Sequence, residues 1–230
     1  MSTAQLISTI LYYAAAFIAV IFVLVPHEFA HAFVAYKNGD WTAKINGRLT
    51  LNPLKHLDPL GLVMVALVGF GWAKPVPIDS RNFKNYKVGL FTTAIAGICA
   101  NLIIAFIVYP LYRVCVIYLP SNYGTYFLEM LLQLIFSYSL SIAVFNLIPL
   151  YPLDGFRIVE SLTKTYNRGR RFLERYGQWI LLGLIAESFI CGILENYIAV
   201  FGYLDILGYV MQFAVRIVGY PITALWGLIL

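Results

Sequence analysis

The chain has 230 residues, of which 61% are hydrophobic and only 12% are charged. A soluble globular domain has about 45–50% apolar and about 25% charged residues, so this composition excludes an ordinary soluble protein and predicts one embedded in a lipid bilayer. Basic loops beside a membrane explain the formal net charge of +5, so we expect no nucleic-acid partner.

Five long apolar runs are distributed over the chain. They cover about residues 6–37, 88–119, 126–150, 176–202 and 204–230. Since a transmembrane helix needs about 20 apolar residues, the sequence predicts an all-α polytopic membrane protein with five or six transmembrane helices. No linker or low-complexity tract divides the chain. We therefore expect one integral-membrane domain over 1–230, with a core of about 6–165 and accessory helices of about 176–230.

The basic residues concentrate in two segments, 37–87 and 157–175, whereas the loop at 119–126 contains none. The positive-inside rule places both basic segments on the cytoplasmic side of the membrane. The runs 88–119 and 126–150 then form an outward and a returning helix, and the N-terminus lies outside. We therefore expect a multi-pass protein of the cell membrane.

Two features distinguish the segment between the first and second long runs. Residues 42–51 alternate around Asn46-Gly47, a dipeptide typical of hairpin turns, which predicts a small β-hairpin. The apolar run 62–73 is about half the length of a span and has basic residues on both sides, which predicts a re-entrant loop. Its Gly69-Phe70-Gly71 favours extended backbone over a helix.

The first apolar run includes the pentapeptide His27-Glu28-Phe29-Ala30-His31. Histidines four residues apart on a helix share one face, so His27 and His31 can bind one zinc ion. Glu28 is offset from these two side chains, where it can act as a general base on a zinc-bound water. At about 1.5 Å per residue the motif lies roughly 30 Å along the helix, near the inner boundary of the bilayer.

A catalytic zinc site has three protein ligands and one open position, and two residues are candidates for the third ligand. His56 lies in a basic, polar connecting segment. Asp154 follows an apolar run that ends on the same predicted side as the two histidines, where Pro152 and Gly155 turn the chain. Asp154 is the preferred ligand, although an Asp-Gly pair is also typical of an ordinary turn or helix N-cap.

Together these motifs resemble the site-2 proteases, the intramembrane zinc metalloproteases, and in particular their short, compact prokaryotic branch. The resemblance covers most of residues 20–180. The matching segments are 27–32 (HEFAHA), 48–61 (RLTLNPLKHLDPLG), 69–76 (GFGWAKPV), 96–101 (AGICAN) and 146–155 (NLIPLYPLDG). HExxH alone occurs in many soluble proteases, whereas its combination with the late N-x-x-P and D-G pairs is specific. The chain departs from the family at Ile98 and Tyr151, where proline is common.

The resemblance implies a role for each motif. The zinc ligands would be His27, His31 and Asp154, with one ion per chain, and Glu28 would be the general base. Asn101 would face the site and hydrogen-bond the substrate or its oxyanion; a hydrogen bond between two spans is the alternative. Asn146 would support the site from a second layer or pack between helices.

The implied activity is hydrolysis of peptide bonds within or next to the membrane-spanning helices of other proteins, in regulated intramembrane proteolysis on the cytoplasmic side. Because a transmembrane helix must unwind before hydrolysis, the segment 69–76, with Gly69, Phe70 and Gly71, offers an extended edge for the unwound substrate. The alternatives are a membrane transporter or channel and an inactive scaffold, each with a structural metal site. A transporter predicts paired repeats with broken helices, which the sequence does not show.

Overall fold

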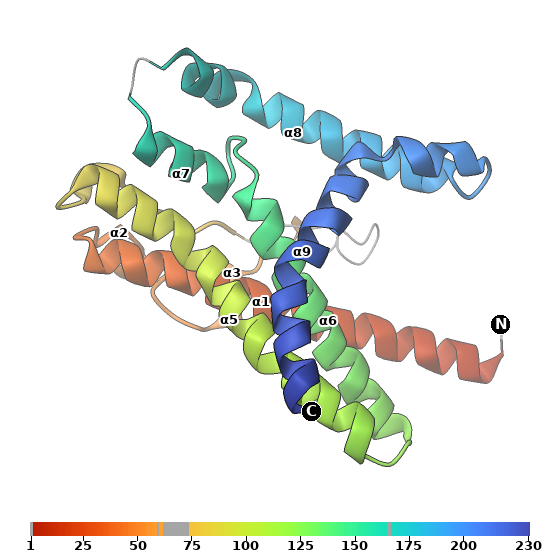
Figure 1. Cartoon of the computed structure of the whole chain (residues 1–230). Coiled ribbons are helices and arrows are strands. Elements are labelled where there is room, and N and C mark those ends of the chain that lie inside the picture. Colours follow the sequence, from red (N-terminus) through yellow and green to blue (C-terminus); the bar gives the residue numbers. More distant parts are fainter. Residues whose placement is uncertain (1, 59, 62–73, 165–166) are drawn as a thin grey trace.

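The computed structural model describes residues 2–58, 60–61, 74–164 and 167–230. These residues form helices and irregular connections, and no β-strand is present among them. Five of the described helices are long and apolar enough to cross a membrane (Figure 1): α1 (Thr3–Lys37), α5 (Tyr86–Tyr118), α6 (Tyr123–Leu147), α8 (Arg168–Leu194) and α9 (Ile206–Ile229). The predicted helical class is confirmed.

Shorter helices connect the long ones. They are α2 (Thr42–Ile45), α3 (Pro53–His56), η1 (Ser80–Asn82), α7 (Asp154–Leu162) and η2 (Ala199–Leu204). A polar residue caps the N-terminus of every long helix and accepts a hydrogen bond from a backbone N–H of the first turn that has no partner within the helix. The caps are Ser2 for α1, Asn85 for α5, Asn122 for α6, Asn167 for α8 and Asp205 for α9.

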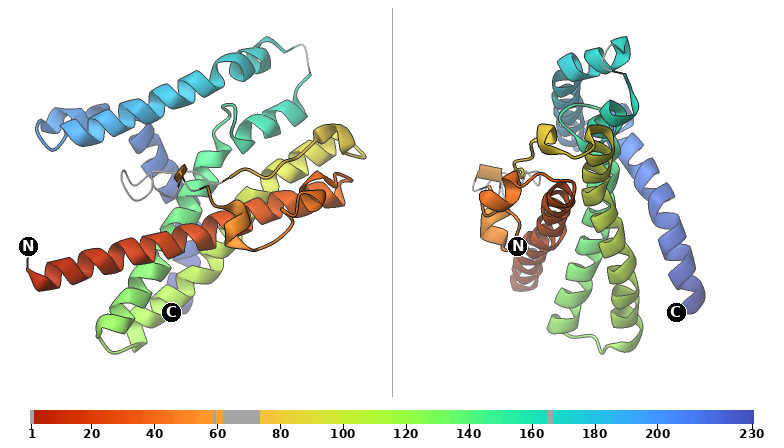
Figure 2. Two further views of the ribbon diagram at one scale, coloured as in Figure 1. Left: turned by 180° about the vertical axis from the view of Figure 1, so that it is seen from behind. Right: turned by 90° about the vertical axis from the view of Figure 1, so that its left-hand side faces the viewer.

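The centre of the molecule consists of α1, α5 and α6, which pack against one another (Figure 2). Small side chains allow this close packing: Ala19, Ala105 and Ala143 are fully buried. Ala19 and Val23 of α1 form a core cluster with Ile135 of α6. Lipid is as apolar as these residues, so helices in a membrane rely on close contact between small side chains. This packing fixes the second half of α1 against α5.

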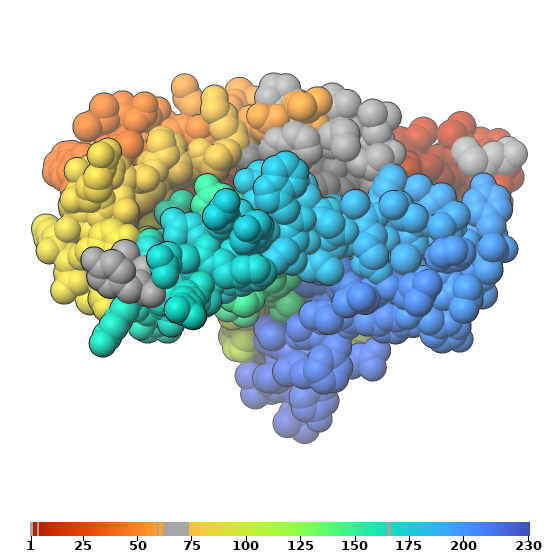
Figure 3. All heavy atoms as spheres, turned by 90° about the horizontal axis from the view of Figure 1, so that it is seen from above, coloured from red at the N-terminus to blue at the C-terminus, as the bar shows by residue number. Residues whose placement is uncertain are grey.

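The two C-terminal helices lie outside this centre. α9 packs along α5 and α6, where Gly219 closely faces Leu140 and the indole N–H of Trp226 donates to the carbonyl oxygen of Phe106. Its C-terminus lies toward the loop between α5 and α6 (Figure 1). α8 contacts α7, η2 and α9, and seen from above it runs across the face nearest the viewer, between α9 and the segment that follows α1 (Figure 3).

The predicted β-hairpin at 42–51 is wrong. Residues Thr42–Ile45 form the helical turn α2 instead. The N–H of Gly47 donates to the carbonyl of Lys44, and the N–H of Arg48 donates to that of Ala43. These two bonds, with Gly47 at φ +63°, form the Schellman motif that ends a helix. A glycine with positive φ suits a hairpin turn and a helix C-terminus equally well, so the local pattern could not distinguish them.

The predicted re-entrant loop at 62–73 lies outside the described residues. Two residues that flank this segment are hydrogen-bonded to each other: the N–H of Lys74 donates to the carbonyl of His56 at 2.8 Å. The chain that follows is held beside α1 by the guanidinium of Arg48, which donates to the carbonyls of Lys74 and Pro75 at 2.6 and 3.3 Å. Val76 packs against the buried Ala32. Residues 74–78 therefore lie next to the HExxH motif.

Candidate metal centre

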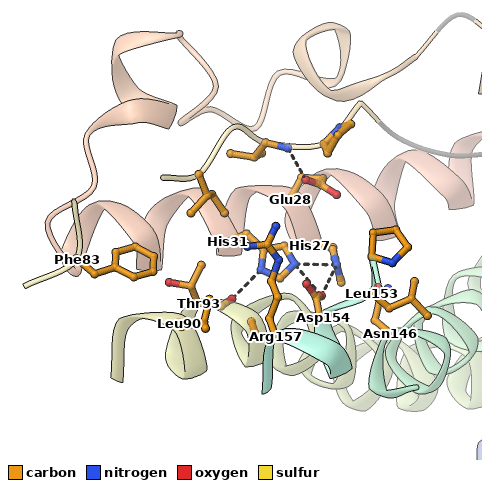
Figure 4. Close-up of a pocket in the computed structure, with 15 residues that line it drawn as sticks. His27, Glu28, His31, Phe83, Leu90, Thr93, Asn146, Leu153, Asp154 and Arg157 are labelled. Atoms are coloured by element: carbon orange, nitrogen blue, oxygen red, sulfur yellow. Dashed lines mark hydrogen bonds and ion pairs between the residues drawn. The ribbon is translucent and has the colours of Figure 1, made fainter. Parts of the chain in front are cut away.

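The HExxH motif lies in the second half of α1, and its histidines point toward α5 and α7 (Figure 4). His27 and His31 are buried, and their Nε2 atoms are 3.0 Å apart. Asp154, the first residue of α7, approaches the same point: its Oδ2 lies 3.5 Å from Nε2 of His27 and 3.0 Å from Nε2 of His31. Within the described part of the chain, these are the His, Cys, Asp or Glu side chains that converge closely enough to hold a metal ion.

Hydrogen bonding determines where the lone pair of His31 points. Its Nδ1 lies 2.7 Å from the carbonyl oxygen of Thr93, and a carbonyl only accepts, so Nδ1 carries a proton. In the neutral ring, Nε2 is then an acceptor that faces Oδ2 of Asp154, a second acceptor. That oxygen is buried and receives no hydrogen bond from the described residues. Facing acceptors with no donor between them fit a cation, and two imidazoles with a carboxylate are a ligand set that zinc uses.

The charge state of Asp154 is consistent with this fit. Burial alone would raise the pKa of its carboxyl, but attraction to the positive charge of His31 and His27 in their protonated forms, for which a metal cation substitutes, outweighs burial and holds the pKa of Asp154 below its ordinary value. The side chain is therefore an anion that can compensate the charge of a metal ion.

Gly97 of α5 allows the backbone of this helix to approach the two histidines. A Cβ atom at this position would lie 2.4 Å from Nε2 of His31 and 2.7 Å from Nε2 of His27. Both distances are far shorter than a van der Waals contact, so any other residue here would push the rings apart or displace the helix. The fit of α5 against the candidate ligands therefore requires glycine.

Asn101, one turn further along α5, lies behind His27. It is fully buried, and its amide lies 3.2 Å from Nδ1 of His27. With Nδ2 toward the ring, Oδ1 has no partner among the described residues. The oxygen and the nitrogen of an Asn side-chain amide are told apart by the hydrogen bonds that each can form. With Oδ1 toward the ring, Asn101 accepts the Nδ1–H of His27, and Nε2 of His27 presents its lone pair to the point where the other two ligands converge.

Glu28 faces a cavity of about 170 Å³ together with the three converging side chains. The cavity lies between α1, residues 75–78 and α7 (Figure 4). Oε2 of Glu28 accepts a hydrogen bond from the N–H of Val76 at 3.1 Å. The carboxylate is therefore held at the cavity, beside the histidines and not between them, which is the position a general base requires.

Arg157 also lines this cavity, and the sequence analysis missed it. It lies on α7 three residues after Asp154, and its side chain extends from α7 toward the histidines (Figure 4). Residues three apart on a helix are neighbours on one face. The D-G-x-R spacing was therefore the signal that could have identified it.

The other candidates from the sequence lie as follows. His56 is fully buried away from the cluster, and its Nε2 lies 2.7 Å from the carbonyl of Thr50. Asn146 lines the cavity, while its amide donates to the carbonyl of Ile142 in the preceding turn of α6. Asn101 is not among the residues that line the cavity. The predicted substrate-binding residues Gly69, Phe70 and Gly71 lie outside the described residues.

Comparison with known proteins identifies relatives of this arrangement. The family model described as "Peptidase family M50" matches residues 114–190. The "Putative zinc metalloprotease YwhC" of Bacillus subtilis is 45% identical over 169 residues, which cover 69% of this chain and 74% of that protein. The "Putative zinc metalloprotease Rip2" of Mycolicibacterium smegmatis is 32% identical over 143 residues, which cover 58% of this chain and 51% of that protein.

A second Rip2, from Mycobacterium tuberculosis, is also 32% identical, over 142 residues. No solved structure matches the chain. The relative from B. subtilis is similar over most of both sequences, and the apolar helices agree with a membrane protease. The chain therefore belongs to peptidase family M50, the site-2 protease family, and is a multi-pass membrane zinc metalloprotease.

Proposed function

We propose that the protein is an intramembrane endopeptidase that hydrolyses peptide bonds within or next to the transmembrane helices of other proteins, in regulated intramembrane proteolysis. In this proposal His27, His31 and Asp154 bind one zinc ion and Glu28 is the general base. The observation that carries it is the convergence of these acceptors on one point of a helix that is long and apolar enough to span a bilayer.

The membrane, its side and the domain organisation form part of the same proposal. The basic segments at 37–87 and 157–175 adjoin the HExxH motif and Asp154, so the positive-inside rule favours an active site toward the cytoplasmic side of the cell membrane. The site combines residues from α1, α5 and α7. This combination supports one catalytic domain over 1–230 with α8 and α9 as accessory helices.

The residues of this chain divide the work of hydrolysis. When bound, zinc would lower the pKa of a water molecule and polarise the scissile carbonyl. Glu28 would take a proton from the attacking water and later deliver it to the leaving amine. The N–H of Val76 holds Oε2 of Glu28 and leaves Oε1 for proton transfer. Thr93 and Asn101 keep the histidine rings in the orientation that ligation requires.

The substrate must present an unwound backbone, because the amides of an intact helix are paired internally. Residues 74–78 are irregular in the structure and line the cavity through Pro75, Val76 and Ile78. Pro75 and Pro77 have no N–H, so the donors of this segment alternate and point to one side. Strand addition at 69–76 stays a prediction; in the described part of that segment, the N–H groups of Lys74 and Val76 donate to His56 and Glu28.

Cleavage of a single-span substrate by the purified protein in liposomes tests the proposal, with zinc measured in the same samples. Glu28→Gln should retain zinc and lose at least about 100-fold in kcat, since general-base catalysis contributes about 10²–10⁴-fold. Glu174→Gln is the matched control, because Glu174 is exposed on α8, and it should cleave like the wild type. Unchanged cleavage by Glu28→Gln would contradict the mechanism; a zinc-loaded wild type that cleaves nothing would favour the scaffold or transporter alternatives.

A further inference from the structure

We propose that Arg157 is a catalytic residue that donates N–H hydrogen bonds to the oxygen of the scissile carbonyl as this oxygen becomes an oxyanion. The inference deepens the proposed function and rests on it, because it concerns the same cavity. The zinc ligands and the general base are thereby joined by a third kind of group, one that stabilises the negative charge that develops on the carbonyl oxygen during attack.

The first observation is the position of Arg157. It lines the cavity that also contains His27, Glu28, His31 and Asp154. It is the one Lys or Arg among the described residues lining this cavity. Because Asp154 is directed at the histidines and Arg157 lies three residues later on the same helix, the two side chains leave α7 on one face. The guanidinium therefore projects into the cavity toward the histidines (Figure 4).

The second observation is that the carboxylates of the cavity and of α7 are engaged elsewhere. Asp154 faces the histidines, and Glu28 accepts from the N–H of Val76. Glu160, one turn further along α7, is paired with Arg170 of α8 and accepts from the hydroxyl of Tyr86. Within the described part of the chain, Arg157 thus forms no ion pair. A cation in a partly enclosed site without an anion is costly and is available to a ligand.

The charges of the site indicate the kind of ligand. A zinc dication, the carboxylates of Asp154 and Glu28, and the guanidinium of Arg157 together leave one positive charge in excess. A peptide is neutral in the ground state, but its carbonyl oxygen acquires a full negative charge when water attacks. Because Glu28 is neutralised when it takes the water proton, the negative charge moves from Glu28 to this oxygen. A cation beside the oxygen therefore stabilises the tetrahedral intermediate more than the substrate, which is the condition for lowering the barrier.

In the attack step, the water oxygen bonds to the carbonyl carbon and a water proton passes to Glu28. The π electron pair of the carbonyl moves onto the oxygen that Arg157 contacts. When the carbon–nitrogen bond breaks, this pair re-forms the carbonyl, and Glu28 gives its proton to the leaving nitrogen. Arg157 stays protonated throughout, because the pKa of a guanidinium is above about 12.

The test measures kcat and KM for the single-span substrate with Arg157→Met and Arg157→Lys, alongside zinc content. Losing one oxyanion donor costs about 10²–10³-fold in kcat, so Arg157→Met should lose about 100-fold in kcat with KM within about 2-fold and full zinc. Arg157→Lys keeps the charge and should lose less. Guanidinium ions added to Arg157→Ala should restore part of kcat. Arg171→Met, at an exposed arginine of α8, is the matched control and should equal the wild type.

Three results would overturn the inference: an unchanged kcat in Arg157→Met, a loss confined to KM, or loss of zinc by both Arg157→Met and Arg157→Lys, which would indicate a structural role. These results differ from a failure of the proposed function. If the proposed function were wrong, the wild type itself would not cleave. If only the role of Arg157 were wrong, the wild type would cleave, Glu28→Gln would not, and the Arg157 variants would give one of these three results.

Discussion

At the scale of single residues, the candidate metal centre depends on side chains that do not bind the metal. Thr93 fixes the tautomer of His31 through its carbonyl oxygen, and Asn101 contacts the far side of His27. Gly97, four residues before Asn101, removes the side chain that would collide with both rings. Three residues of one helix thus determine how two residues of another are oriented, which is how outer contacts tune a metal site.

Asn101 gives a prediction at this scale. Replacing it with Ala removes the partner of His27, so the affinity for zinc should fall by about 10–100-fold. Cleavage should return toward the wild-type rate when excess zinc is supplied. The measurement is a zinc titration of cleavage and of bound metal. A variant that is fully zinc-loaded but has a raised KM would instead support a contact between Asn101 and the substrate.

At the scale of elements, the connection after α1 is organised around one buried carboxylate. Asp40 is fully buried and accepts hydrogen bonds from the N–H of Thr42 at 3.0 Å, the N–H of Asp79 at 2.8 Å and the amide of Asn82 at 3.0 Å. It thereby joins the end of α1 and the start of α2 to the segment that leads into α5. The same segment contains Val76, whose N–H donates to the carboxylate of Glu28, the proposed general base.

Asp40 makes the stability of the protein depend on pH. Burial raises the pKa of its carboxyl, but the hydrogen bonds from Thr42, Asn82 and Asp79 outweigh burial, and the pKa of Asp40 lies below its ordinary value. A group with a lowered pKa stabilises the fold above its unfolded value, about 3.9, and this contribution is lost as the pH falls through the folded value. Asp40→Asn should cost about 1–3 kcal/mol near neutral pH.

Thermal unfolding of the wild type and Asp40→Asn at several pH values checks this. The difference in Tm should be largest near neutral pH and should shrink below about pH 4, because protonated Asp40 resembles Asn. Other carboxylates titrate equally in both proteins and cancel in the difference. A difference in Tm that stays constant with pH would show that the charge of Asp40 contributes nothing.

At the scale of the whole molecule, the candidate metal centre adds a link between α1 and α7, which both pack on α5. α1 and α5 belong to the central packing, whereas α7 follows the end of α6 and leads into α8. Asp154 links the start of α7 to α1 through the histidines. A bound zinc ion would therefore stabilise the position of α7, and with it that of Arg157.

Removing the metal should consequently affect stability as well as activity. A chelator such as 1,10-phenanthroline should abolish cleavage and lower Tm, and added zinc should restore both; a ligand at 100 times its Kd contributes about 2.7 kcal/mol. Glu28→Gln should keep the zinc-dependent shift in Tm, while Asp154→Ala should lose it. If Asp154→Ala shifted as much as the wild type, Asp154 would not be a ligand.

The sequence alone was sufficient for features that depend on local periodicity. Apolar runs of spanning length predicted the helices, and the spacing of His27 and His31 placed two imidazoles on one helix face, because a helix brings residues four apart together. The same locality explains the error at 42–51. Asn46-Gly47 fits a hairpin turn and a helix C-terminus alike, and the contacts of Asp40 with Asp79 and Asn82, which favour the helical turn, come from distant sequence.

Only the tertiary structure decided what surrounds the two histidines. It brought Asp154 to them and not His56, although both were candidates, and placed Asn101 behind His27 instead of in the cavity. It also revealed Arg157 in the same cavity as Glu28. These relations depend on how α1, α5 and α7 pack, and packing is determined by the shapes of all their side chains together. The sequence by itself determined the pair of histidines on one helix face and the apolar helices, while the tertiary structure decided which third side chain converges on that pair and the charge of the cavity.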